Sequence, residues 1–123
     1  MDEEILESFR QKLERDREET RKSLARVQAE GRGLGEDCPT DSGEVSVMTF
    51  SREFLFQQST LRRQLLSRID AALERINNRT FGECAECGDE IEGKRLKAMP
   101  FTAYCRECQE NLERQSLGER KGA

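Results

Sequence analysis

The sequence predicts a mainly α protein: a long antiparallel coiled-coil helical hairpin, a small C-terminal knob built on four cysteines, and a short C-terminal helix. Two segments rich in helix-forming residues each carry one apolar stripe, and a glycine-rich stretch separates them. Two Cys-x-x-Cys pairs then follow, with seventeen residues between them. Helices with a single apolar stripe pack in pairs, and paired cysteines at this spacing staple small knobs.

The composition excludes a large globular core. Of the 123 residues, 34% are hydrophobic and 37% are charged. Such a chain is elongated, partly disordered or stapled by something other than apolar packing. No stretch approaches the roughly 20 apolar residues of a membrane span, and the acidic N-terminus does not resemble a signal peptide. We therefore expect a cytoplasmic protein, a compartment that also keeps cysteines reduced.

Residues 2 to about 30 are predicted to form the first helix. They contain neither Pro nor Gly and are rich in Glu, Arg, Leu and Gln, which are strong helix formers. One seven-residue register is occupied by Leu6, Leu13, Thr20 and Val27. A stripe this narrow requires one partner helix along its length, as in a coiled coil.

A breaker region follows, with three glycines in five positions and then Pro39. The helical pattern resumes from about residue 49 to Asn77, and its apolar stripe consists of Phe54, Leu61, Leu65, Ile69, Leu73 and Ile76. Two helices of similar length joined by a breaker predict an antiparallel hairpin. We expect the hairpin over residues 1–78, with a tip loop at about 31–48, and the knob with the C-terminal helix over residues 79–123.

The two cysteine pairs, Cys84 with Cys87 and Cys105 with Cys108, predict one structural zinc site in a Cys₄ zinc-finger knob. Two such pairs complete a tetrahedron of thiolates around Zn²⁺, and Gly88 suits the tight turn after the first pair. The chain has no histidine, so four cysteines are the ligand set it can build without carboxylates. Two disulfides or a thioredoxin-like redox pair are the alternatives that the spacing leaves open.

The rest of the knob is predicted to be small. Its core is expected at Phe81, Ile91, Leu96, Phe101 and Tyr104. After Cys108 the sequence predicts a short helix to about Leu117 and then a frayed polar tail.

The breaker loop carries the first candidate functional residues, Asp41, Glu44 and Ser46. Acidic residues ahead of a helix are commonly N-terminal caps, and that interpretation stays open. However, the loop lies at the predicted tip of the hairpin and concentrates negative charge, because no Lys or Arg occurs from Gly33 to Ser51. Cys38 in the same loop is expected to be an inert thiol, since neighbouring acids disfavour the thiolate; a redox-sensing thiol is the alternative.

The charge balance indicates a protein partner. The net charge is −4, and a zinc ion held by four thiolates would add about two further negative charges. Zinc domains that bind nucleic acid usually carry a basic excess, so we expect no specific DNA binding. The chain has no Ser/His/Asp set, no catalytic cysteine–histidine pair and no Gly-rich phosphate loop. A Cys₄ zinc has no open position for a substrate water, so we expect no enzyme.

The run FGECAECGDEIEGKRLKAMPFTAYCRECQ, preceded by a long helix, resembles the DksA/TraR family of C4 zinc-finger transcription factors. The motif that carries the resemblance is FG-x-C-x-x-CG-x-x-I…RL-x-A-x-P…C-x-x-C. The resemblance implies a monomeric protein that binds the large catalytic subunits of bacterial RNA polymerase. Its knob would dock at the rim of the secondary channel, and its coiled-coil tip would reach toward the active site and modulate initiation without contacting DNA.

The resemblance also assigns site residues. Better-known members carry Asp-x-x-Asp-x-Ala at the tip, and Asp41, Glu44 and Ser46 stand in those places here. Both acidic positions of the motif are kept, but Glu44 replaces the second Asp, so its carboxylate extends to a different distance from the backbone.

Responsive members grip the alarmone guanosine tetraphosphate with basic residues, and the matching positions here are Arg68, Met99 and Gln109. Only Arg68 is basic, so we predict a weak or absent alarmone response. Arg95 is a further candidate contact with the alarmone or the polymerase rim, and a solvated basic face is the alternative for both arginines.

Three other functions remain as alternatives. A zinc-stapled coiled-coil interaction protein would use the same architecture on another protein partner. A redox or hydrolytic zinc enzyme would need fewer than four sulfur ligands on the metal. A transcript-cleavage factor would use the acidic tip to hold Mg²⁺ in the polymerase channel.

Overall fold

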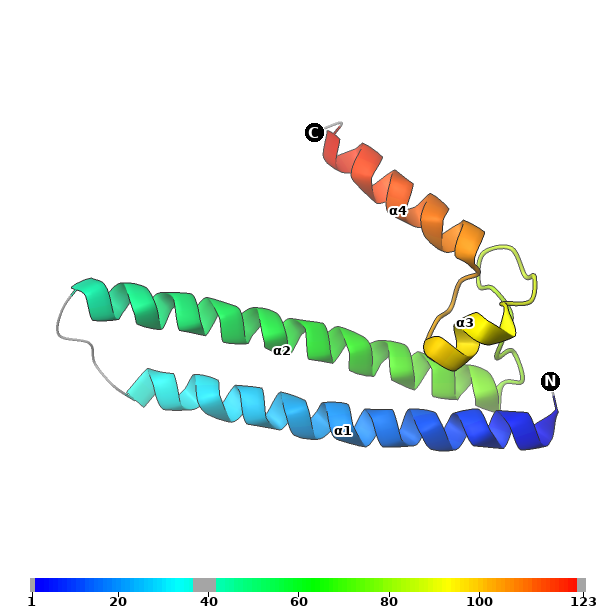
Figure 1. Cartoon of the computed structure of the whole chain (residues 1–123), viewed down its shortest axis with the longest axis horizontal. Coiled ribbons are helices and arrows are strands. Elements are labelled where there is room, and N and C mark those ends of the chain that lie inside the picture. Colours follow the sequence, from blue (N-terminus) through cyan, green and yellow to red (C-terminus); the bar gives the residue numbers. More distant parts are fainter. Residues whose placement is uncertain (1, 37–41, 122–123) are drawn as a thin grey trace. The chain divides into compact units, whose positions relative to one another are not determined.

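A computed structural model describes residues 2–36 and 42–121 of the chain. Within these residues the regular structure is helical, apart from an isolated antiparallel bridge between Glu83 and Glu90. This confirms the predicted mainly α class. The helices in chain order are α1 (Glu3–Glu36), α2 (Ser42–Asn77), α3 (Gly93–Ala98) and α4 (Arg106–Lys121) (Figure 1).

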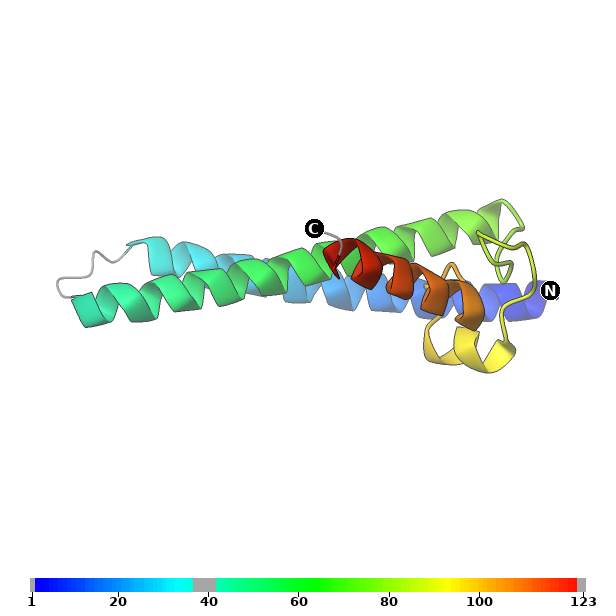
Figure 2. The same cartoon turned by 90° about the horizontal axis from the view of Figure 1, so that it is seen from above.

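The chain divides into two compact units, and α1 and α2 contribute to both. We call the first the cysteine unit, formed by Met1–Leu13 and Ile69–Ala123. The second is the hairpin unit, Glu14–Arg68. Within the hairpin unit the α1 and α2 segments lie side by side in both views (Figures 1 and 2). None of the helices in the described ranges is long and apolar enough to cross a membrane.

The cysteine unit contains the apolar core of the described residues. Its buried apolar side chains are Leu13, Ile69, Ala72, Ile76, Phe81, Cys84, Ile91 and Leu96. The Phe9 and Phe81 rings lie 5.1 Å apart between centroids, which joins α1 to the segment that leads into the cysteines. The predicted knob core is therefore confirmed at Phe81, Ile91 and Leu96, whereas Phe101 and Tyr104 are only half-buried.

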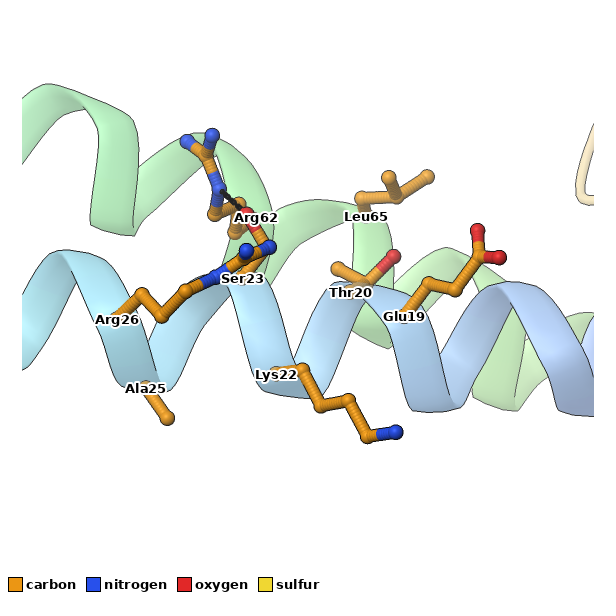
Figure 3. A pocket seen from close by; sticks show the side chains of 8 residues that line it. All are labelled: Glu19, Thr20, Lys22, Ser23, Ala25, Arg26, Arg62 and Leu65. Carbon is orange, nitrogen blue, oxygen red and sulfur yellow. Dashed lines mark hydrogen bonds between the residues drawn. The ribbon is translucent and has the colours of Figure 1, made fainter.

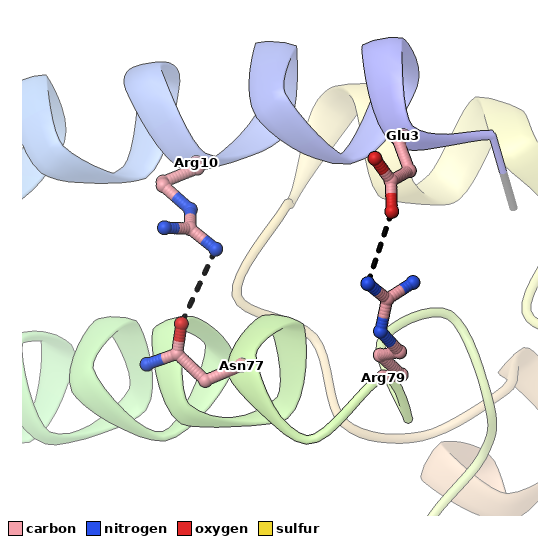
Figure 4. A network of polar contacts seen from close by, with 4 residues as sticks. All are labelled: Glu3, Arg10, Asn77 and Arg79. Atoms are coloured by element: carbon pink, nitrogen blue, oxygen red, sulfur yellow. Dashed lines mark hydrogen bonds and ion pairs between the residues drawn. The ribbon is translucent and has the colours of Figure 1, made fainter.

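Helix α2 ends at Asn77, the predicted residue. Arg79 has a φ of 61°, and the N–H of Thr80 donates to the carbonyl of Arg75 at 2.9 Å. A left-handed residue with this backbone bond is a common way for a helix to end. Two exposed contacts cross from α1 in the same place: Arg79 pairs with Glu3 at 2.9 Å, and Arg10 donates to Asn77 at 3.2 Å (Figure 4). Exposed contacts of this kind contribute at most about 1 kcal/mol each.

The tip loop is shorter than predicted. Helix α1 continues to Glu36, through Gly31 and two further glycines, and α2 begins at Ser42 instead of about residue 49. Each glycine costs a helix only about 1 kcal/mol relative to alanine and keeps its backbone N–H, so glycines weaken a helix without ending it. The predicted loop at about 31–48 is therefore wrong in its bounds.

The seam between α1 and α2 in the hairpin unit is partly polar. Arg62 on α2 donates from Nε to the hydroxyl of Ser23 on α1 at 2.6 Å (Figure 3). It also donates from Nη1 to the side chain of Gln58 at 2.8 Å. Ser59 on α2 is buried. A surface cleft of about 850 Å³ borders this contact.

The apolar stripe predicted for α2 holds at Leu65, Ile69, Leu73 and Ile76, which are buried or half-buried, and is wrong at Phe54 and Leu61. Phe54 and Leu61 are 51% and 58% exposed. The positions that face α1 are those of Ser59 and Arg62, roughly a third of a turn away around the helix.

Candidate metal centre

The first cysteine pair lies in a tight backbone turn. The N–H of Cys84 donates to the carbonyl of Asp89 at 2.8 Å, and the N–H of Gly88 returns to the carbonyl of Cys84 at 3.0 Å. Gly88 has a φ of 76°, a conformation that residues with a Cβ rarely adopt. The turn brings Cys84 and Cys87 to the same side, as the sequence predicted from the glycine.

The second pair is placed by a helix. Cys105 immediately precedes α4 and Cys108 lies in its first turn. The N–H of Gln109 donates to the carbonyl of Cys105 at 2.9 Å, so the helical bonding pattern already begins at Cys105. One turn of helix therefore sets the distance between these two sulfurs.

The four sulfurs form one cluster. All four Sγ atoms lie within 4.8 Å of one another, and those of Cys87 and Cys105 are 3.8 Å apart. A tetrahedron of thiolates at the usual zinc–sulfur distance has edges of about 3.8 Å. All four cysteines are free thiols, so the cluster contains no disulfide. The donor set fits a tetrahedral metal ion, and zinc is the metal that such a set holds most often.

The four thiols differ in how readily they ionise. Burial by itself would raise the pKa of Cys84, but hydrogen bonds from the backbone N–H groups of Cys87 and Cys105 help to lower it to about 6. The neighbouring sulfurs of Cys105 and Cys84 raise the pKa of Cys108. One thiolate therefore forms easily, whereas four together need a cation among them.

Residues 101–104, which lead into the second cysteine pair, form a segment that we call the strap. Arg75 on α2 donates from one terminal nitrogen to the carbonyls of Phe101 and Thr102, at 3.4 and 3.2 Å. Burial lowers the pKa of Arg75. Its half-buried guanidinium thus faces backbone oxygens instead of a carboxylate, and it ties the strap to the last turns of α2.

The second half of the strap, Ala103 and Tyr104, accepts hydrogen bonds from residues between the two cysteine pairs. The N–H of Ala85 donates to the carbonyl of Ala103 at 2.8 Å, and Arg95 donates from Nε to the carbonyl of Tyr104 at 3.2 Å. Each carbonyl of the strap thus accepts a hydrogen bond. The bond from Ala85 also connects the turn of the first cysteine pair to the segment that carries the second.

The structure brings together the four predicted metal ligands. Asp41 lies outside the described residues, as does Cys38. Glu44 and Ser46 lie in the first turns of α2.

The predicted basic contacts have different surroundings. Arg68 is exposed on α2. Arg95 is half-buried against the strap, which gives it a structural contact in addition to its predicted role. Met99 is 40% exposed at the end of α3, and Gln109 on α4 donates to Glu113 at 3.2 Å.

Sequence reasoning missed Arg75 and α3. The signal for Arg75 was an arginine next to Ile76, inside the apolar stripe of the second helix. The signal for α3 was the run KRLKA between the cysteine pairs, which consists of good helix formers.

The four-cysteine segment and the whole chain both have known counterparts. A family model described as the prokaryotic dksA/traR C4-type zinc finger matches residues 79–114. A protein of Aquifex aeolicus is 36% identical over 118 residues, which make up 94% of this chain and 81% of the relative. The RNA polymerase-binding transcription factor DksA of Caulobacter vibrioides is 31% identical over 118 residues, 93% of this chain and 80% of that protein.

A solved structure agrees with these sequence matches. Transcription factor DksA2 from Pseudomonas aeruginosa matches with a TM-score of 0.81 and 30% identity, covering 94% of this chain and 88% of that one. The similarity therefore includes both long helices as well as the cysteine segment.

Proposed function

Because this chain belongs to the DksA/TraR family of C4 zinc-finger proteins, we propose that it is a transcription regulator that binds bacterial RNA polymerase. The observation that carries the proposal is the similarity to DksA2 over nearly the whole of both chains, helices included. A shared cysteine segment would support only a shared zinc knob. Similarity of both long helices supports a shared way of acting, in which the hairpin itself is the working part.

The metal in this proposal is one structural Zn²⁺ held by Cys84, Cys87, Cys105 and Cys108. Bound there, it would link the two cysteine pairs and supply folding energy to a knob with a small core. The four sulfurs fill a tetrahedral site and leave no position for a substrate water. This supports a binding protein and not an enzyme.

The knob is proposed to dock at the rim of the polymerase secondary channel, while Asp41, Glu44 and Ser46 at the tip lie near the active site. The net charge of −4 and the acidic tip support action through protein contacts, without specific DNA binding. The protein would act in the cytoplasm, as a monomer, and modulate initiation.

Guanosine tetraphosphate is proposed to have little effect on this protein. Of the three positions that match the alarmone contacts of responsive relatives, only Arg68 is cationic; Met99 and Gln109 are not. Arg95 already donates to the strap through Nε. A polyphosphate needs several donors to replace its hydration, and this chain offers few.

The test is a pull-down of zinc-loaded protein on immobilised bacterial RNA polymerase, combined with a measurement of open-complex lifetime. Asp41→Asn with Glu44→Gln should leave polymerase binding within about two-fold, because affinity would come from the rest of the protein, and should abolish the effect on lifetime. Glu14→Gln with Glu18→Gln is the matched control. It removes the same charge from two exposed sites on α1 and should change neither readout.

Two results would contradict the proposal at different levels. If the protein does not bind polymerase, the function is wrong, and a zinc-stapled interaction protein with another partner becomes the better interpretation. If it binds and the tip variant keeps its full effect on open complexes, polymerase binding stands and the assignment of the tip is wrong.

A further inference from the structure

The hairpin unit contains two arginines that have no acidic partner among the described residues. Arg62 on α2 is half-buried, and it donates only to uncharged acceptors, the hydroxyl of Ser23 at 2.6 Å and the carbonyl and side chain of Gln58 at 3.1 and 2.8 Å. Arg26 on α1 makes no hydrogen bond or ion pair with any residue in the described ranges. A cation that is partly removed from water usually has a counter-charge. The two guanidinium groups therefore mark a place where an anion would be stabilised.

Both arginines line the cleft of about 850 Å³ beside the polar seam, which we call the seam cleft. Arg26 lies one turn along α1 from Ser23, and its side chain extends toward that serine (Figure 3). Residues three apart on a helix are neighbours, so the guanidinium of Arg26 can reach the hydrogen bond between Ser23 and Arg62. The cleft thus receives cationic side chains from both long helices.

Donor groups of three side chains remain available to a ligand in the seam cleft. Nη2 of Arg62 has no acceptor within the described part of the chain. The planar guanidinium of Arg26 has all of its N–H donors free of contacts with described residues. The oxygen of Ser23 accepts from Arg62, which leaves the serine O–H to donate. Two guanidinium forks and a hydroxyl suit an oxyanion with several acceptor atoms.

The charge of the seam cleft favours a doubly charged anion. Its lining contains three cationic side chains and one acidic side chain, those of Lys22, Arg26, Arg62 and Glu19. The charge of these side chains together is +2, although the whole chain carries −4. A phosphate ester has a charge of about −1.5 to −2 at neutral pH and three acceptor oxygens, so it matches both the charge and the donors. A carboxylate has one charge and would satisfy less of the cleft.

We infer that the seam cleft binds a phosphate group, either free or carried by a small molecule, through the guanidinium groups of Arg26 and Arg62 and the hydroxyl of Ser23. This site is separate from the metal centre, from the tip residues and from the three positions considered above for the alarmone. It goes beyond the proposed function, because binding at the seam cleft requires no polymerase.

The surroundings of the two arginines favour a small ligand over a nucleic acid. Glu19 lines the cleft on one side, with Thr20 between it and the arginines (Figure 3). On the other side, Glu30 follows Arg26 by one turn of α1. A nucleic-acid backbone requires cations in a continuous row, whereas acidic residues bound this basic site along α1. The rest of the cleft, which includes the side chain of Leu65, has room for the organic part of a small molecule.

A phosphate group held by both arginines would connect α1 to α2 across the seam. A ligand that binds the folded hairpin and not the separated helices stabilises the fold by mass action. Thermal unfolding therefore gives a second readout of binding, in addition to the signals of the arginines themselves.

The test is a titration of the zinc-loaded full-length protein with inorganic phosphate and with glucose 6-phosphate at about pH 7, where both carry the required charge. The ionic strength is kept constant with chloride, and the Nε–H signals of the arginines are followed by NMR. The signals of Arg26 and Arg62 should shift and saturate with both ligands, and the melting temperature should rise. Arg26→Gln should weaken binding at least about ten-fold, because it removes a charged donor fork. This change breaks no contact among the described residues, so the hairpin should keep its fold.

Arg63→Gln is the matched control. Arg63 is exposed on α2 next to Arg62 but does not line the seam cleft, so its replacement removes the same charge and should change the affinity less than about two-fold. Arg62→Lys keeps the charge of the cleft and should still weaken binding, since lysine lacks the planar fork. Circular dichroism and zinc content should be unchanged in all variants.

The outcomes decide between a specific site and a general attraction. Shifts of the wild-type signals that do not saturate, or that are no larger than those caused by chloride, would overturn the inference. An equal loss in Arg63→Gln would also overturn it, because the binding would then follow net charge alone. If a single-stranded oligonucleotide binds more tightly than both ligands and loses affinity in Arg26→Gln, a nucleic acid is the occupant and the inference is wrong.

The two ligands also identify the source of the phosphate group. Tighter binding of glucose 6-phosphate would assign the seam cleft to phosphorylated small molecules, and equal binding would assign it to free phosphate; both results support the inference. Because the titration contains no polymerase, its failure would leave the proposed function intact.

Discussion

Replacing Arg75 by methionine tests whether the strap couples α2 to the metal centre. Methionine keeps most of the apolar stem and removes the guanidinium that donates to Phe101 and Thr102, at 3.4 and 3.2 Å. One nitrogen serves both carbonyls at long distances, so we count one charge-assisted hydrogen bond, worth about 2 kcal/mol. If the strap is ordered only in the metal-bound protein, this energy contributes to metal binding. The expected result is a zinc affinity up to about 30-fold weaker.

The assay is competition for zinc between the full-length protein and a chromophoric chelator. Arg106→Met is the matched control, because Arg106 forms an exposed pair with Glu110 at 3.2 Å on α4. Its loss should change the affinity less than about two-fold. Arg75→Lys should give an intermediate value, since lysine keeps the charge without the planar fork. The guanidinium stays protonated in proteins, so the difference between Arg75→Met and the parent should be constant from about pH 6.5 to 8.

The reasoning is refuted if Arg75→Met retains zinc as well as Arg106→Met does. The bonds to the strap would then form equally in the metal-free protein and would not contribute to metal binding. A fall in thermal stability with unchanged zinc affinity would support that alternative.

Two further predictions concern packing and backbone conformation. Leu13→Ala should lower the free energy of unfolding by about 3 kcal/mol, because the side chain is 0% exposed. Leu61→Ala, at a position that is 58% exposed, should lower it by less than about 0.5 kcal/mol. Urea unfolding followed by circular dichroism measures both, and equal losses would contradict the burial argument. Gly88→Ala should destabilise the zinc-loaded protein by about 1 kcal/mol through its φ of 76° alone, since a Cβ there meets nothing within 4 Å. Gly93→Ala, which also meets nothing within 4 Å, is the control and should be neutral; similar melting temperatures for the two variants would exclude backbone strain at Gly88.

The metal ligands could be predicted from the sequence because their chemistry is local. Two residues between cysteines allow both sulfurs of a pair to reach one ion, and this holds in a turn, as at Cys84, and at a helix start, as at Cys105. The hairpin was also predictable, since helix formers and apolar spacing act over a few residues. The bounds of the tip loop could not be predicted, because the glycines from Gly31 onward weaken a helix without ending it, and α1 continues to Glu36.

The remaining contacts of the site depend on parts of the chain that are distant in sequence. Arg75 finds its partners in a strap 26 and 27 residues away. No sequence pattern predicts that the carbonyls of Phe101 and Thr102 lie within hydrogen-bonding distance of Arg75 in the last turns of α2. Arg95 is similar: as a sequence feature it is a basic residue in a basic run, and only the folded knob directs its Nε to Tyr104.

The sequence by itself determined the helical class and the two cysteine pairs whose sulfurs cluster, whereas the acidic residues assigned to the tip stay a prediction. Only the tertiary structure decided which face of α2 is covered in the hairpin unit. Both faces are spaced at threes and fours, so periodicity cannot choose between them. The choice depends on the partner helix, as at Arg62, which donates to Ser23 on α1. Phe54 and Leu61 lie away from that contact and are left in solvent.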